Sequence, residues 1–247
     1  MQEMASSTSV YSSRHYASTG LLDRRGRRRS PITLPGYGAG RVNKDRGRRR
    51  PAMVLSSAEI IRLLAQTPSN PRVISGHRDR ALIIMLLRTG LRISEALAML
   101  PEHLDLHDGW IWIPAGKGDQ PGVIKIDRWA ITYLQEWLAV RSRIEGLPPD
   151  APVICTFMQP DPGRPLGAPQ VRDRLRLLGK RAGIAKRVHP HALRHTLATD
   201  LVREGQSMRV VQAQLRHQHL LTTERYIARL MPGEGLSHLA DRPGLNL

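Results

Sequence analysis

The fold is decided by the stretch Arg78-Asp-Arg-Ala-Leu-Ile-Ile-Met-Leu-Leu-Arg-Thr-Gly90, which continues directly as Leu91-Arg-Ile-Ser-Glu95. The apolar run from Ala81 to Leu87 leaves no polar face over two helical turns, so this helix should lie in the centre of the core. The turn Thr89-Gly90 ends the helix. We therefore expect a helical domain that is built around residues 78–88.

A short helix is expected directly after that turn, because Ala96, Leu97 and Leu100 supply a buried stripe. Arg92 then stands at the N-terminus of this helix. There its guanidinium adds to unpaired backbone N–H groups and to the positive end of the helix dipole. This combination is suited to binding an oxyanion.

The rest of the chain predicts a mainly α fold with a small antiparallel β-sheet. Two β-rich runs, 110–113 and 123–126, should form a hairpin with Lys117 between two glycines at its tip. A loop with at most one short strand, at 153–156, is expected between 146 and 169. On the helix after the hairpin, the side chains expected to be buried are Trp129, Ile131, Leu134, Trp137 and Leu138. The remaining helices are expected at about 57–66, 128–144, 170–182, 190–204, 207–216 and 222–230.

The composition narrows the class of protein. There are 38 Lys and Arg against 21 Asp and Glu, a formal net charge of +17, which indicates a polyanionic partner. Aromatic residues make up only 4%, which argues against a β-sandwich and against a stacking platform for single strands. The single cysteine, Cys155, excludes an internal disulfide and predicts a reducing compartment. The longest apolar run is too short to span a membrane, so we do not expect a membrane as a partner.

The basic charge is concentrated near the N-terminus. Residues 1–50 have a net charge of +9, and the string Arg-Gly-Arg-Arg-Arg occurs there twice in Ser/Gly/Pro-rich sequence that cannot bury a core. We interpret this segment as a disordered basic arm. It is either a solvated tail or a polyanion-binding segment that neutralises phosphates, and a transit peptide is disfavoured because no helical apolar pattern is present. The arginines expected to bind DNA are Arg25, Arg27, Arg28, Arg29, Arg46, Arg48, Arg49 and Arg50.

Several motifs in a fixed order resemble those of the tyrosine recombinases, the integrase family of DNA breaking and rejoining enzymes. The matching motifs are Thr89-Gly-Leu-Arg-Ile-Ser-Glu95, Gly116-Lys-Gly118, His191-Ala-Leu-Arg-His195, Leu215-Arg-His217 and Thr222-Thr-Glu-Arg-Tyr226. Each motif alone is weak, but together they are specific. The resemblance covers about residues 51–230 and implies a catalytic integrase domain there, with a C-terminal tail at 231–247.

The resemblance implies a reaction and a role for each matching residue. The Tyr226 hydroxyl attacks a DNA phosphodiester to form a 3′-phosphotyrosyl link, with no ATP, metal or other cofactor. Two arginines, Arg92 and Arg194, bind the non-bridging oxygens. The other implied roles are general base for His191, general acid for Lys117, phosphate hydrogen bonding for His217 and support of the site for Glu95.

Simpler roles stay open for these residues. Arg194 could serve a structural ion pair, and Lys117 could be an exposed charge of the hairpin. A metal site at His189, His191 and His195 is disfavoured because a carboxylate or thiolate ligand is missing. Tyr226 is the only tyrosine after residue 50 besides Tyr133, which we expect in the core.

The sequence also departs from the family. About 50 residues precede the catalytic segment, where family members commonly have a helical clamp domain, so the basic arm or an accessory protein would replace it. Arg216 stands where the family usually has glycine and could shift His217 or contact a phosphate. A homotetramer on double-stranded DNA in the nucleoid of a prokaryotic cytoplasm is implied. Its purpose could be phage integration, plasmid resolution or transfer of a mobile genetic element.

Two other functions remain as alternatives to a recombinase. A decayed relative would bind DNA without cutting it, and binding would fall steeply with salt. A type IB topoisomerase would use the same chemistry to relax one duplex.

Overall fold

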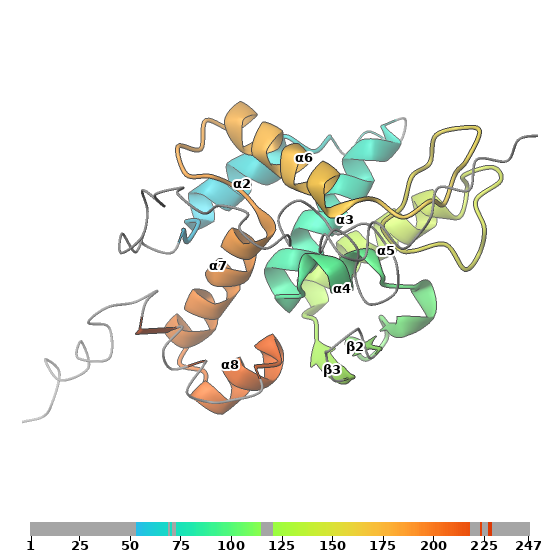
Figure 1. The fold of residues 1–247 in the computed structure, drawn as a ribbon. Helices are drawn as coiled ribbons and strands as arrows, with labels where there is room; N and C mark the ends of the chain where they lie inside the picture. Colours follow the sequence, from blue (N-terminus) through green and yellow to red (C-terminus); the bar gives the residue numbers. More distant parts are fainter. Residues whose placement is uncertain are drawn as a thin grey trace, which may run out of the picture. The chain divides into compact units, whose positions relative to one another are not determined.

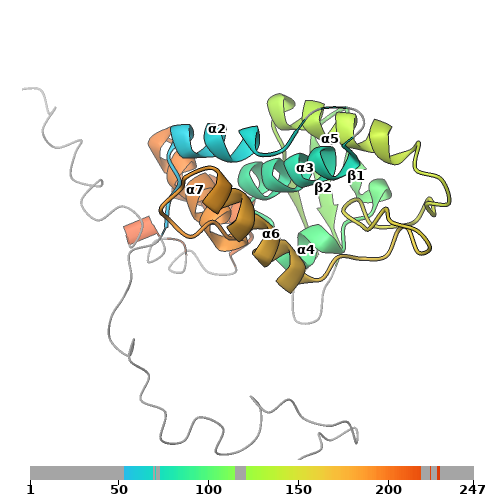
Figure 2. The same ribbon diagram turned by 90° about the horizontal axis from the view of Figure 1, so that it is seen from above.

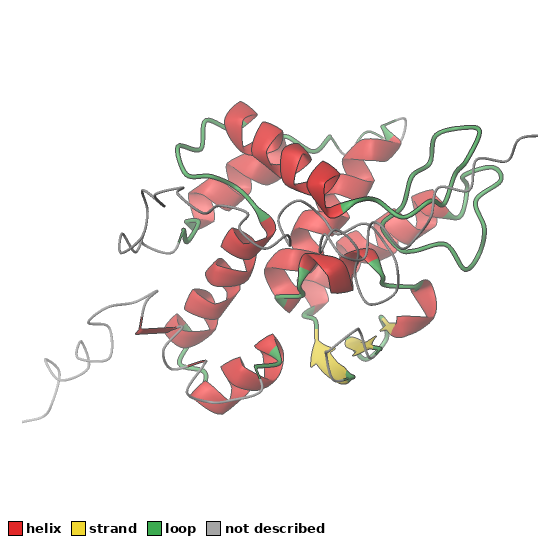
Figure 3. Ribbon diagram, viewed as in Figure 1, coloured by secondary structure: helices red, strands yellow, loops and turns green. Residues whose placement is uncertain are grey.

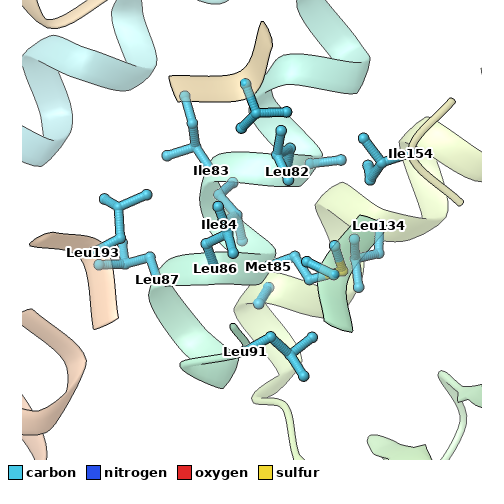
Figure 4. Close-up of a cluster of buried hydrophobic side chains, with 14 of the residues drawn as sticks. Leu82, Ile83, Ile84, Met85, Leu86, Leu87, Leu91, Leu134, Ile154 and Leu193 are labelled. Atoms are coloured by element: carbon cyan, nitrogen blue, oxygen red, sulfur yellow. The ribbon is translucent and has the colours of Figure 1, made fainter. Parts of the chain in front are cut away.

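Helix α3 (Ile74–Thr89) is the central element of the computed structural model, which describes residues 53–68, 70, 73–114, 121–217, 223, 227 and 228. Every residue from Ala81 to Leu87 is buried, and Figure 4 shows their side chains meeting Leu134, Ile154 and Leu193 from other parts of the chain. The α3 helix packs against α5 (Arg128–Arg141) and α7 (Pro190–Arg203), and Figure 1 shows it in the middle of the ribbon. The central position predicted from the apolar run is confirmed.

The other helices lie close to the predicted ranges. Figure 2 shows α2 and α6 beside α3 in the view from above. The α3 helix begins at Ile74, four residues earlier than predicted. The N-cap residue Val73 makes no side-chain cap hydrogen bond, so the sequence does not mark this start. The remaining bounds are α2 (Ser57–Ala65), α4 (Ile93–Leu97), the 3-10 helix η2 (Pro101–His103), α6 (Ala168–Arg181) and α8 (Met208–Leu215).

Side-chain caps explain where several helices begin. The Ser56 side chain accepts from the Glu59 N–H, while the Glu59 carboxylate accepts from the Ser56 N–H, which is a complete capping box. The side chains of Asp127 and Ser207 cap α5 and α8 by accepting from the N–H groups of Ala130 and Val210, without the reciprocal bond of a capping box. These polar residues satisfy N–H groups that have no partner within the helix.

The sheet has three antiparallel strands in the order β1-β2-β3, and Figure 3 shows them together at one edge of the helical unit. The strands are β1 (Leu104–Asp105), β2 (Trp110–Ile113) and β3 (Gly122–Lys125), with Trp110 opposite Lys125. Alternation buries Ile111, Ile113 and Ile124 and leaves Trp110 and Trp112 exposed. The predicted hairpin is confirmed, and β1 is an additional short strand.

One local prediction, the burial of Trp129, was wrong. Trp129 is 45% exposed rather than buried, because it lies beside the stripe formed by Ala130, Ile131, Leu134 and Trp137. Its ring instead packs edge-on against Tyr133 at a centroid distance of 5.0 Å. The segment 153–156 forms an isolated bridge between Cys155 and Pro165, which agrees with the predicted loop containing at most one short strand.

A second apolar cluster joins α7 and α8. It consists of Leu197, Ala198, Val211, Leu215 and Ile227, with Leu201 and Met208 partly buried beside it. The apolar side chains of α7 and α8 therefore face each other. Thr223 and Ile227 are helical, and the rest of the helix expected at 222–230 lies outside the described residues apart from Ala228.

Some predictions concern residues that the structure does not describe. These are the basic arm at 1–50 and the tail at 231–247. In the described ranges, no helix combines the length and the apolar character needed to cross a membrane.

Candidate active site

Arg92 lies at the start of α4, as predicted. It is the N-cap residue, with an extended backbone (φ −66°, ψ 148°), and it follows the tight turn at Gly90. Its guanidinium donates from Nη1 to Glu95 Oε1 at 2.9 Å, and its backbone N–H donates to Glu95 Oε2 at 2.8 Å. Glu95 therefore fixes both the backbone and the side chain of Arg92.

Glu95 also binds a second arginine. Its carboxylate is almost fully buried, and Oε1 accepts from Arg216 Nη1 at 2.8 Å. One carboxylate thus holds α4 and the end of α8 together. The supporting role in catalysis that the family resemblance implies for Glu95 stays a prediction.

Arg194 joins three helices. It is buried on α7, and its guanidinium donates from Nη1 to the Gly90 carbonyl and from Nη2 to the Leu215 carbonyl, the latter at 2.6 Å. Gly90 stands two residues before Arg92, and Leu215 stands two residues before His217. One guanidinium therefore brings the ends of α3 and α8 to the same place.

His217 leaves α8 through a Schellman motif. The Arg216 N–H donates to the Ala213 carbonyl and the His217 N–H donates to the Gln212 carbonyl, both at 3.1 Å, with Arg216 in the left-handed conformation at φ 53°. The imidazole is oriented by the buried Thr223, whose Oγ1 lies 3.0 Å from Nδ1. A neutral ring that accepts the Thr223 proton at Nδ1 carries its own proton on Nε2.

The electrostatics tie these residues into one site. Burial lowers the pKa of His217 to about 4, with Arg194 and Arg92 as the charges that add to this effect. The pKa of His191 is also lowered, mainly because the ring is partly buried and in addition because it lies near the charges of Arg194, Arg172 and Arg92. Four predicted residues, Arg92, His191, Arg194 and His217, therefore share one positively charged region in which both imidazoles are neutral near pH 7.

Two further residues belong to this region. Arg172 lies exposed on α6 and acts on His191, although nothing in its local sequence singles it out. Thr223 is part of the Thr222-Thr-Glu-Arg-Tyr226 motif, but only the folded chain reveals its contact with His217.

Other predicted site residues lie outside the described part of the chain. They are Lys117, Tyr226 and the eight arginines of the basic arm. For metal binding, the described residues contain no suitable group of three or more His, Cys, Asp or Glu side chains. His189 and His191 have ring centroids 6.4 Å apart and stand beside arginines rather than carboxylates.

We expect the stability of the protein to fall as the pH decreases from about 6.5 to about 4. Burial, with nearby His191, His189 and Arg194, lowers the pKa of His195 to about 4, as burial and arginines do for His217. Between that value and the unfolded pKa of about 6.5 the unfolded chain binds more protons, so the free energy of unfolding rises with pH. Urea unfolding at several pH values should show this slope, and His195→Gln should reduce it.

A surface histidine provides the control for this experiment. His107→Gln, at a side chain that is 93% exposed and lies 2.9 Å from Asp108, shows how replacement of a surface histidine alters the slope. Burial raises the pKa of Asp200, so near the acidic end of this range Asp200 makes the free energy of unfolding decrease with rising pH, opposite to the histidines. An unchanged slope in His195→Gln would contradict the prediction.

Gly90 is required both for its conformation and for its lack of a side chain. Its φ is 68°, and a Cβ there would lie 2.9 Å from Leu197 Cδ2 and 3.0 Å from Leu215 Cδ2. We expect Gly90→Ala to reduce the free energy of unfolding by about 2–4 kcal/mol, as left-handed strain and overpacking add. Gly183→Ala is the matched control, since Gly183 has φ 64° and nothing within 4 Å of its Cβ position. Equal losses in both variants, measured by urea unfolding, would rule out the packing contribution.

A mainly helical domain with a small antiparallel sheet and this group of arginines and histidines is the class of domain found in the tyrosine recombinases. The chain belongs to the phage integrase family, whose model matches residues 53–231. This confirms the resemblance and the fold class that were inferred from the motifs.

Individual relatives agree with this assignment. The chain is 32% identical over 193 residues to the tyrosine recombinase XerC of Yersinia pestis, covering 78% of this chain and 60% of that protein. It is 35% identical over 149 residues to XerC of Serratia marcescens, covering 60% and 47%. The chain therefore spans about half to three fifths of these curated relatives.

Solved structures show the same fold. The XerA recombinase superposes with a TM-score of 0.66 at 25% identity, over 85% of this chain and 73% of that one. The XerH recombinase bound to its difH substrate before cleavage superposes with a TM-score of 0.59 at 25% identity, over 78% of this chain and 53% of that one.

Proposed function

We propose that this protein is a site-specific DNA recombinase or integrase that cleaves and rejoins DNA through Tyr226. The observation that supports this most strongly is the placement of Arg194, which binds the carbonyls two residues before Arg92 and two residues before His217. A phosphodiester that enters this region meets two guanidiniums and neutral imidazoles. Such preorganised donors stabilise the negative charge of a transition state.

The proposed step exchanges one phosphoester bond for another. The Tyr226 phenolic oxygen attacks phosphorus, the bond from phosphorus to the 5′-oxygen breaks, and a 3′-phosphotyrosyl link forms. The phenol proton passes to His191, and the departing 5′-oxygen takes a proton from Lys117. Attack by a 5′-hydroxyl of the partner strand reverses these transfers, so the cycle needs no energy source.

The environment of each histidine suits its proposed role. The lowered pKa of His191 keeps this ring neutral near pH 7, so it can accept a proton. His217 would donate from Nε2 to a non-bridging oxygen while Thr223 holds Nδ1. Arg92 and Arg194 would bind the non-bridging oxygens, a task for which the planar guanidinium is better suited than lysine.

Double-stranded DNA is the proposed partner. The relative XerH is bound to its difH substrate in its structure, and a net charge of +17 favours a polyanion here. The eight arginines of residues 1–50 would add phosphate contacts. We further propose a homotetramer on DNA, with an accessory protein or the basic arm in place of a clamp domain, in the nucleoid of a prokaryotic cell.

Trapping of the covalent intermediate tests this function. The full chain is incubated with a pool of nicked duplexes with a randomised central sequence, so that the short strand beyond the nick is lost after cleavage. We expect a DNA adduct that survives SDS, forms in EDTA and maps to the peptide containing Tyr226. Sequencing of the trapped ends would identify the preferred target.

The same assay separates the alternatives. Salt-sensitive binding without an adduct would indicate a non-catalytic DNA-binding relative, and deletion of residues 1–50 should then weaken binding. Relaxation of a supercoiled plasmid without recombinant product would indicate a type IB topoisomerase. A metal requirement, or an adduct on another residue, would contradict the proposal.

A further inference from the structure

Arg216 occupies a position where its side chain is not expected. It is the residue after α8, with φ 53° and ψ 47°, and among the described residues it alone has a positive φ without being glycine. The left-handed region is unfavourable for a residue with a Cβ, and such a conformation persists where the surroundings determine it. The backbone at this point therefore suits glycine, and the arginine side chain must have another role.

The Arg216 side chain crosses from α8 to the start of α4. It is nearly buried, with 13% exposure, and its Nη1 lies 2.8 Å from Glu95 Oε1, the oxygen that also accepts from Arg92 Nη1. On the way it passes over Gly122, where a Cβ would lie only 2.7 Å from Arg216 Nε. Arg216 thus contacts α4 and β3, and β3 follows the segment that carries Lys117 in the sequence.

The charges of this group explain what Arg216 adds. Arg92 and Glu95 form an ion pair with no net charge, which weakens the attraction of Arg92 for a phosphate. Arg216 shares the same carboxylate oxygen, so the three side chains together carry one positive charge. We call Arg92, Glu95 and Arg216 the Glu95 network.

We infer that Arg216 is a positioning residue, which acts through Glu95 to keep Arg92 aligned toward the scissile phosphate and to offset the negative charge of the Glu95 carboxylate beside it. This inference rests on the proposed function and goes beyond it, since it assigns to the arginine before His217 a role in setting the reactivity of Arg92. The role is indirect, so Arg216 itself need not contact DNA.

A double-mutant cycle tests the inference. Arg216→Gly keeps the left-handed backbone without strain and removes the side chain, while Glu95→Gln removes the charge through which Arg216 acts. We expect Arg216→Gly to lower the single-turnover cleavage rate of the nicked duplex between about tenfold and a hundredfold. In the Glu95→Gln background the same change should cost less than about twofold.

Three further measurements separate positioning from other roles. Arg216→Lys should restore the larger part of the rate, because an ammonium can still bind the Glu95 carboxylate. Gly122→Ala, which leaves the network residues intact but displaces the Arg216 guanidinium, should also slow cleavage. Arg216→Gly should leave the salt slope of non-covalent DNA binding unchanged, whereas loss of a phosphate contact would reduce it by about one.

The outcomes distinguish this inference from the proposed function. Equal rate losses for Arg216→Gly in both backgrounds, or no loss in the wild-type background, would overturn the positioning role while adduct formation by the wild type upholds the recombinase. The cycle is repeated on the free energy of unfolding without DNA, and absence of coupling there would also overturn the inference. Coupling in stability together with no adduct in the wild type would refute the proposed function, and with it the catalytic role of the network.

Discussion

Replacement of Tyr226 by phenylalanine is expected to abolish the covalent DNA adduct completely. The substitution removes only the phenolic oxygen, which is the proposed nucleophile, and it retains the ring. A tyrosine hydroxyl has a pKa near 10 in water, so it also depends on a nearby base for deprotonation. The loss should therefore appear in the chemical step, while duplex binding stays at the wild-type level.

The residues on either side of Tyr226 support this prediction. Thr223, three residues before it, is buried with its hydroxyl 3.0 Å from His217 Nδ1. Ile227, directly after it, belongs to the apolar cluster with Val211 and Leu215. Thr223 and Ile227, which lie close to Tyr226 in the sequence, are thus attached to the elements that carry the charged region.

Tyr133→Phe is the matched control for this experiment. Tyr133 is partly buried, packs against the core and has its ring centroid 5.0 Å from that of Trp129. It should form the adduct at the wild-type rate, as measured by SDS gel after incubation with the nicked duplex. An adduct that persists in Tyr226→Phe would show that another residue is the nucleophile.

Replacement of Arg194 should impair both folding and catalysis. In Arg194→Ala the carbonyls of Gly90 and Leu215 lose their donors in a buried place, at about 1–3 kcal/mol each. We expect the free energy of unfolding to fall by about 2–5 kcal/mol. Cleavage should fall below detection, because the ends of α3 and α8 are no longer held together.

Arg194→Lys keeps the positive charge but removes the planar guanidinium with its several N–H donors. A single ammonium cannot donate to two carbonyls on different elements and also bind a phosphate through two oxygens. We expect cleavage to fall by about 10²–10³ in urea-free buffer, where the folded state should still dominate. Arg143→Lys, at an exposed position just after α5, should behave as the wild type. Cleavage by Arg194→Lys at the wild-type rate would exclude a phosphate role for the guanidinium.

The predictions for Tyr226 and Arg194 are complementary, because they separate chemistry from architecture. Tyr226→Phe should unfold at the same urea concentration as the wild type, whereas Arg194→Ala should unfold earlier. A measurement of both rate and stability for each variant therefore identifies which of the two effects has occurred.

Local patterns in the sequence were sufficient for most of the fold. The apolar run Ala81–Leu87 predicts a buried helix because a helix without a polar face has no place on a surface. The two β-rich runs give the hairpin. Trp129 was assigned to the wrong side of α5, since a bulky ring at the edge of an apolar stripe can pack against surface neighbours instead.

The residues of the candidate site were also recognisable from motifs, but their contacts were not. Spacing along the chain placed Arg92 at a helix start and placed His191 and Arg194 on one helix. It did not reveal that Arg194 binds the Gly90 and Leu215 carbonyls, because these residues lie 104 and 21 positions away from it in sequence.

Sequence patterns alone were enough for the helical class, for the family and for a set of candidate site residues, because apolar periodicity and the order of motifs can be recognised without knowing which segments meet in space. The contact of Arg216 with Glu95 became visible only in the tertiary structure, because the two residues are 121 positions apart in the sequence. The left-handed backbone of Arg216 was also not predictable, because arginine has no preference for that conformation. The tertiary structure likewise decided the neutral state of His217, because burial and the approach of Arg194 and Arg92 exist only in the folded chain.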